Sequence, residues 1–132
     1  MGIKAEYSPE HGVVKARQSY NGYIACWEHP KGNEPNRIHF AAMCVEHCLK
    51  ALISYERGVG KVPHGHELAQ YMHSLPFDLS SHDKLVYLFD GMSVYSRYDE
   101  VDEKIIDDPE EMAQELMDFI RTTERICGVS HN

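Results

Sequence analysis

Apolar residues along the chain recur mainly at intervals of three or four positions, the spacing of one face of an α-helix. The pattern predicts five helices, at residues 9–29, 36–57, 66–75, 82–98 and 109–127. Segments rich in proline and glycine separate the first three helices. No run of four to eight residues alternates apolar and polar positions with β-branched enrichment, so no strand is predicted. The predicted fold class is all-α.

The helix at 36–57 has two apolar stripes, and such a helix needs cover on two sides, so we expect it to be central. The stripes are formed by Ile38, Ala41, Ala42, Val45, Leu49 and Leu52, and by Phe40, Cys44, Ala51 and Tyr55. With connections of this length, the long helices are expected to form an up-and-down antiparallel bundle, with 66–75 as a short extra helix. A stripe left over would need a second chain to cover it. We expect one domain over residues 1–132.

Charge and hydropathy narrow the classes of partner. The formal net charge is −8 and the sequence pI is about 5.5, so the chain lacks the broad basic field of non-specific nucleic-acid binders. Any contact with RNA or a nucleotide must then come from a local pocket. No apolar stretch approaches the roughly 20 residues that span a bilayer, and the first ten residues are polar. We expect a cytoplasmic protein with no membrane contact.

The cysteines offer one arrangement that could hold zinc. Cys44, His47 and Cys48 lie close together on one predicted helix, and the histidines of His64-Gly65-His66 follow in a loop. The two cysteines also fit the apolar stripes, where cysteine behaves as a small hydrophobic residue. No CxxC pair is present. We therefore expect free thiols, no metal and no cofactor.

Three segments in order resemble the HEPN family. The central helix carries AAMCVEHCLKAL from Ala41 to Leu52, a Gly/Pro loop leads to Gly65-His66-Glu67-Leu68, and the fourth helix ends Ser96-Arg97-Tyr98. In that family the second helix reads as an AAEKALKALL-type segment, a His-Asp-Leu-type start follows, and a later helix ends in an Arg-Tyr-Pro-type turn. The resemblance covers roughly residues 36 to 98. It departs from the family at Asp99, where proline is usual.

The resemblance implies a ligand site. The residues that match the family positions are Glu46, Lys50, His66, Arg97 and Tyr98. Lys50, His66 and Arg97 would hold phosphate groups, while Tyr98 or Tyr95 stacks on a base. It also implies a homodimer, a nucleotide or RNA ligand, and a small nucleotidyltransferase as partner. Read without the family, Glu46 and Lys50 are an i,i+4 surface pair, His66 bonds its own loop, and Arg97 pairs with the acidic segment after it.

Catalysis would require more than these residues. HEPN ribonucleases carry an arginine followed, after four to six residues, by a histidine, because arginine holds the phosphate while histidine moves a proton. Counted from Arg97, positions 102–104 are Asp, Glu and Lys. Arg57 and His64 have six residues between them, but they span a loop where the family does not place the motif. We assign no catalytic residue and expect a binding module, with a metal-independent ribonuclease of toxin type and a structural adaptor as alternatives.

Overall fold

The computed structural model describes residues 7–29, 31, 34–90, 106 and 108–129. This part of the chain contains helices and no strand, which confirms the all-α fold class. The helices are α1 (Pro9–Glu28), α2 (Glu34–Arg57), α3 (Leu68–His73), α4 (Asp83–Phe89) and α5 (Pro109–Cys127), with 3-10 turns η1 (Val59–Lys61) and η2 (Ser80–His82). None of these helices combines the length and the apolar character needed to cross a bilayer.

Local signals set the ends of the long helices. The Ser8 side chain accepts a hydrogen bond from the backbone three residues on, and Pro9 occupies the first helical position of α1. Asp108 plays the same part for α5, because its carboxylate accepts from two backbone N–H groups at 3.1 Å. Gly128 ends α5 in the left-handed conformation, with φ 67°. Both helices therefore begin where the sequence predicts.

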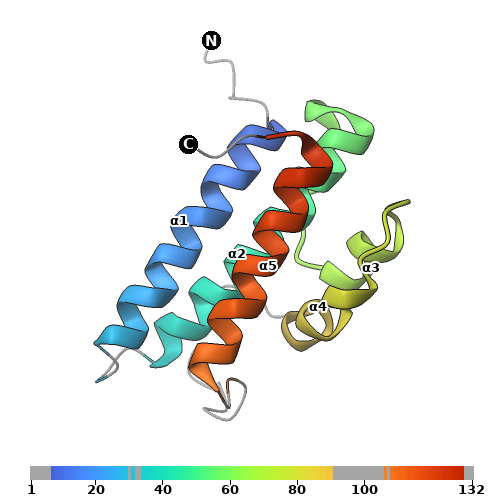
Figure 1. Ribbon diagram of the computed structural model, residues 1–132. Coiled ribbons are helices and arrows are strands. Elements are labelled where there is room, and N and C mark those ends of the chain that lie inside the picture. Colours follow the sequence, from blue (N-terminus) through green and yellow to red (C-terminus); the bar gives the residue numbers. More distant parts are fainter. Residues whose placement is uncertain (1–6, 30, 32–33, 91–105, 107, 130–132) are drawn as a thin grey trace.

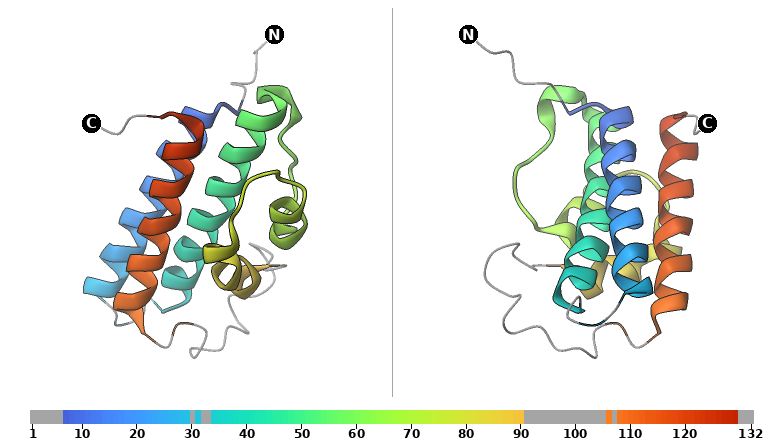
Figure 2. Two further views of the ribbon diagram at one scale, coloured as in Figure 1. Left: turned by 45° about the vertical axis from the view of Figure 1, so that its right-hand side comes forward. Right: turned by 90° about the vertical axis from the view of Figure 1, so that its left-hand side faces the viewer.

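The three long helices pack side by side (Figure 1). Helix α1 runs antiparallel to α2 and α5, which run in the same direction (Figure 2). The short helices α3 and α4 lie beside α2, away from α1 (Figure 1). The buried apolar side chains of all five helices join in one cluster.

Helix α2 is the central helix, as predicted. Its residues from Ala41 to Ile53 include eight apolar side chains that are fully buried: Ala41, Cys44, Val45, Cys48, Leu49, Ala51, Leu52 and Ile53. Helix α1 covers the second stripe so closely that a Cβ atom at Gly12 would lie 2.6 Å from the Ala51 Cβ. This stripe is thus covered within the chain as far as Ala51, and beyond it Tyr55 is 50% exposed.

The two short helices differ from the sequence prediction. The helix expected at 66–75 is observed as Leu68–His73, and the helix expected at 82–98 begins at Asp83 and reaches Phe89. Asp90 leaves the helical conformation, with ψ 135°, and its carboxylate accepts from the Ala69 N–H at 3.0 Å. Residues 91–98, and with them Arg97 and Tyr98, lie outside the described residues.

Candidate functional site

Three of the residues that the HEPN resemblance singles out meet around one carboxylate. Glu46 lies on α2, Lys50 follows one turn later, and His66 stands in the loop before α3. One Glu46 oxygen lies 3.4 Å from the Lys50 Nζ, and the other lies 2.5 Å from the His66 Nδ1. The side chains are 6% exposed for Glu46, 11% for Lys50 and 34% for His66. We call Glu46, Lys50 and His66 the Glu46 cluster.

The burial of the Glu46 cluster decides between two interpretations of its sequence. Glu46 and Lys50 have the i,i+4 spacing of a surface ion pair, but both are buried. A buried ion pair brings little net stability, because the two charges lose their hydration. Helix stabilisation therefore does not explain why Glu46 and Lys50 are buried.

The cluster leaves two groups available to a ligand. An ionised carboxylate only accepts hydrogen bonds, so the Nδ1–H of His66 donates to Glu46 and the Nε2 atom carries the lone pair. The ammonium group of Lys50 has three donors, and the long contact with Glu46 is its only bond within the described residues. The lysine suits a phosphate or carboxylate group, and the Nε2 lone pair of His66 suits a hydroxyl donor on the same ligand.

A second polar contact lies next to the Glu46 cluster on α2. The Tyr7 hydroxyl lies 2.5 Å from the His47 Nδ1 and the two rings stack, while the Ser54 hydroxyl donates to the Tyr7 carbonyl. Burial raises the pKa of the Tyr7 phenol well above its ordinary value, and burial lowers the pKa of His47 to about 4. Tyr7 therefore donates to a neutral imidazole, and the segment before α1 is fastened beside Glu46.

The loop that carries His66 is held by its own side chains. The Tyr71 hydroxyl donates to the Glu67 carboxylate at 3.1 Å. Burial, followed by this bond to Glu67, raises the pKa of Tyr71 to about 12. A Cβ atom at Gly65 would overlap a Glu67 carboxylate oxygen, so a larger residue there would require the exposed Glu67 side chain to move. The bond between Tyr71 and Glu67 ties the residue after His66 to α3.

The other sequence candidates are not brought to this cluster by the described structure. Arg57 donates to the Ser74 carbonyl at 3.2 Å, and His64 is exposed. Cys44 and Cys48 are fully buried in the core, as their apolar neighbours predict. Within the residues that the structure describes, no three His, Cys, Asp or Glu side chains are placed to hold a metal ion.

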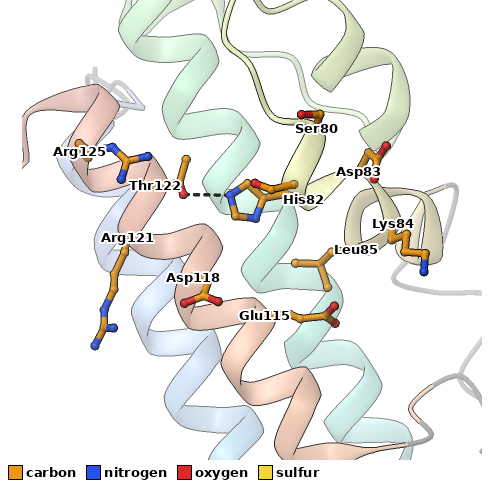
Figure 3. Close-up of a pocket in the computed structure, with 11 residues that line it drawn as sticks. Ser80, His82, Asp83, Lys84, Leu85, Glu115, Asp118, Arg121, Thr122 and Arg125 are labelled. Carbon is orange, nitrogen blue, oxygen red and sulfur yellow. Dashed lines mark hydrogen bonds between the residues drawn. The ribbon is translucent and has the colours of Figure 1, made fainter.

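A groove beside α5 was not predicted from the sequence. It has a volume of about 600 Å³ and runs between α5 and the segment of η2 and the start of α4 (Figure 3). His82 is buried there, stacks on Phe119 and lies 2.9 Å from the Thr122 hydroxyl through its Nε2 atom. Burial lowers the pKa of His82, which favours the neutral ring. Figure 3 shows Asp118 and Glu115 on the turns of α5 that precede Thr122.

Comparisons with family models, curated proteins and solved structures find no match for this chain. The HEPN resemblance therefore remains an expectation from the sequence, and the chemistry of the Glu46 cluster is the structural observation that bears on function.

Proposed function

We propose that this chain is a HEPN-type protein that binds a nucleotide or RNA through the Glu46 cluster. The observation that supports this is the meeting of Glu46, Lys50 and His66, which come from α2 and from a loop 20 residues away from Glu46. The resemblance to the HEPN family singles out the same three residues from the sequence alone. An acidic chain needs a local cation to hold phosphate, and Lys50 has donors to offer.

The proposal includes the parts of the family pattern that lie beyond the described residues. Arg97 would add a second cation to the Glu46 cluster, and Tyr98 would stack on a base. It includes a complete up-and-down antiparallel bundle, a homodimer, and a small nucleotidyltransferase as a partner. The protein would act in the cytoplasm.

A second function, metal-independent RNA cleavage of the toxin type, is favoured by one observation. His66 is oriented by a carboxylate through Nδ1, which is the arrangement that prepares the other ring nitrogen for proton transfer. Against it stands the sequence after Arg97, which lacks histidine at 102–104. Binding without cleavage is therefore the preferred function.

The test measures binding and cleavage together. A fluorescein-labelled RNA hairpin is titrated with the protein and followed by fluorescence anisotropy, and its length is checked on a denaturing gel. ATP is tested separately by thermal shift. The His66→Gln variant keeps a donor for Glu46 but removes the imidazole, and we expect it to bind about 3- to 10-fold more weakly, the worth of one hydrogen bond. The matched control is His64→Gln in the same loop, which should bind as the wild type does.

Three outcomes separate the alternatives. Cleavage that disappears in an Arg97→Ala variant would establish the ribonuclease. No binding of the hairpin and no thermal shift with ATP would leave the structural adaptor. Equal binding by wild type, His66→Gln and Arg97→Ala would show that the ligand does not use the Glu46 cluster.

A further inference from the structure

The outer face of α5 changes the sign of its charge along its length. Glu111, Glu115 and Asp118 are exposed on its first half, and Arg121 and Arg125 are exposed on its last two turns. At 100° per residue these five side chains fall within one side of the helix. Among the described residues, no ion pair joins any of them to another group. The face, which we call the α5 face, is therefore charged, polarised and unpaired.

Grooves lie on both sides of the α5 face. One is the groove of about 600 Å³ shown in Figure 3, and the other, about 450 Å³, lies between α5 and α1. The second is lined by the partly exposed apolar side chains of Tyr20, Trp27 and Met117. Asp118 and Arg121 line both grooves, so they stand on the ridge between them.

The sequence of charges is complementary to its own reverse. Glu115 and Arg125 are ten residues apart, which is about 15 Å along a helix. If a second α5 runs antiparallel across the midpoint of that interval, its Arg125 comes opposite Glu115, and its Arg121 comes within one residue, about 1.5 Å along the helix, of the position opposite Asp118. Two-fold symmetry repeats both pairs, which gives four ion pairs from two kinds of contact.

We propose that the α5 face binds the α5 face of a second copy of this chain in antiparallel fashion, with Trp27 covered at the edge of the contact. This rests on the homodimer in the proposed function and names the surface that forms it. Two chains of net charge −8 repel each other overall, so their association needs local complementarity of this kind. The groove lined by Trp27 supplies apolar area that such a contact would remove from water.

A charge exchange tests the proposal. Sedimentation velocity is recorded for the full-length wild type, for Glu115→Arg, for Arg125→Glu, and for an equimolar mixture of the two variants. Each variant alone brings like charges together, and we expect its dimer to dissociate about tenfold more readily or worse. In the mixture both pairs are attractive again, so dimers should return. The double variant Glu115→Arg with Arg125→Glu should also form a homodimer.

The exchange separates association from helix stability. Acids near the N-terminus and bases near the C-terminus also stabilise α5 itself, so each reversal could weaken the helix. Mixing cannot repair a weakened helix, whereas it does repair a contact between copies. If a reversal unfolds the chain, judged by circular dichroism, Glu115→Gln and Arg125→Gln take its place and should each weaken the dimer. The control is Glu56→Arg, an exposed reversal on α2 that should leave the dimer unchanged.

The outcomes decide the matter. Fluorescence of Trp27, the only tryptophan of the chain, should change on dilution of the wild type and stay constant for the single variants. A wild type that remains monomeric at its highest soluble concentration overturns the proposal, as does a dimer that neither reversal weakens or that the mixture fails to restore. Ligand binding is read separately with His66→Gln, which should leave the dimer intact, so failure of the ligand site and failure of the α5 face are distinguishable.

Discussion

Replacing Glu46 with leucine removes the only hydrogen-bond acceptor recorded for Lys50 among the described residues. The Lys50 side chain, which is 11% exposed, would then lack the opposite charge of Glu46. Removal of one member of a buried ion pair costs about 3–5 kcal/mol. Because small domains have a free energy of unfolding of about 5–15 kcal/mol, the Glu46→Leu variant should lose a large part of its stability.

The reverse replacement is expected to be milder. In Lys50→Met, Glu46 keeps His66 as its hydrogen-bond partner at 2.5 Å, and methionine occupies much of the space of the lysine chain. We expect a loss of about 1–3 kcal/mol. In the double variant Glu46→Leu with Lys50→Met no buried charge is left unpaired. It should therefore be more stable than Glu46→Leu alone, with a coupling of about 1–3 kcal/mol in the double-mutant cycle.

Urea unfolding at pH 7, followed by circular dichroism, measures all four proteins of the cycle. The control is Glu56→Leu on the exposed end of α2, which should change the free energy of unfolding by less than about 0.5 kcal/mol. Two results would contradict a buried Lys50 that depends on Glu46: a loss of less than about 1 kcal/mol in Glu46→Leu, or a double variant that loses the sum of the two single losses. Either result would mean that water or another group satisfies Lys50.

Three further changes test other parts of the structure. Burial lowers the pKa of His47 to about 4, below the value of about 6.5 in an unfolded chain, so the unfolded chain binds more protons between these pH values. Urea titrations should therefore show that the free energy of unfolding falls by up to about 3 kcal/mol between pH 7 and pH 4. The loss should be smaller in His47→Asn. Gly12→Ala places a Cβ 2.6 Å from that of Ala51. A lower melting temperature, from a net loss of about 1–2 kcal/mol, should outweigh the better helix propensity, and a raised one would contradict the close packing. Asp108→Ala removes the cap of α5 and should cost about 1 kcal/mol by urea unfolding, whereas Asp108→Asn should cost less.

Features that depend on neighbours in the sequence could be predicted. The cap at Asp108 acts on N–H groups two and three residues away, so α5 begins where its sequence indicates. The burial of α2 follows from the spacing of its apolar residues, because a helix with two apolar stripes has to be covered twice. Glu46 and Lys50 could be paired from their spacing alone. Their burial depends on α1, α3 and the loop before α3, which no local pattern specifies.

Features that depend on distant contacts could not be predicted. The apolar spacing of Leu85, Leu88 and Phe89 continues toward residue 98, yet Asp90 leaves the helix and binds the backbone of Ala69. Leu88 shares this spacing, yet it is 38% exposed. The bond between Tyr7 and His47 spans 40 residues, and no sequence pattern pairs the two. The contact between Glu46 and His66 was not predicted, although the family resemblance singles out both residues.

Three polar residues on the buried surface of α2 bear on the proposed ligand site. Glu46, Lys50 and Ser54 repeat every fourth residue and are all buried, on a helix whose remaining surface from Ala41 to Ile53 is largely apolar. Apolar residues at these positions would avoid the loss of hydration and would serve the core at least as well. The Ser54 hydroxyl donates to the Tyr7 carbonyl, whereas the buried pair of Glu46 and Lys50 would gain a role from the proposed ligand. The double variant Glu46→Leu with Lys50→Met carries this argument to a measurement, because it should fold stably and yet fail to bind the RNA hairpin or ATP that the wild type binds.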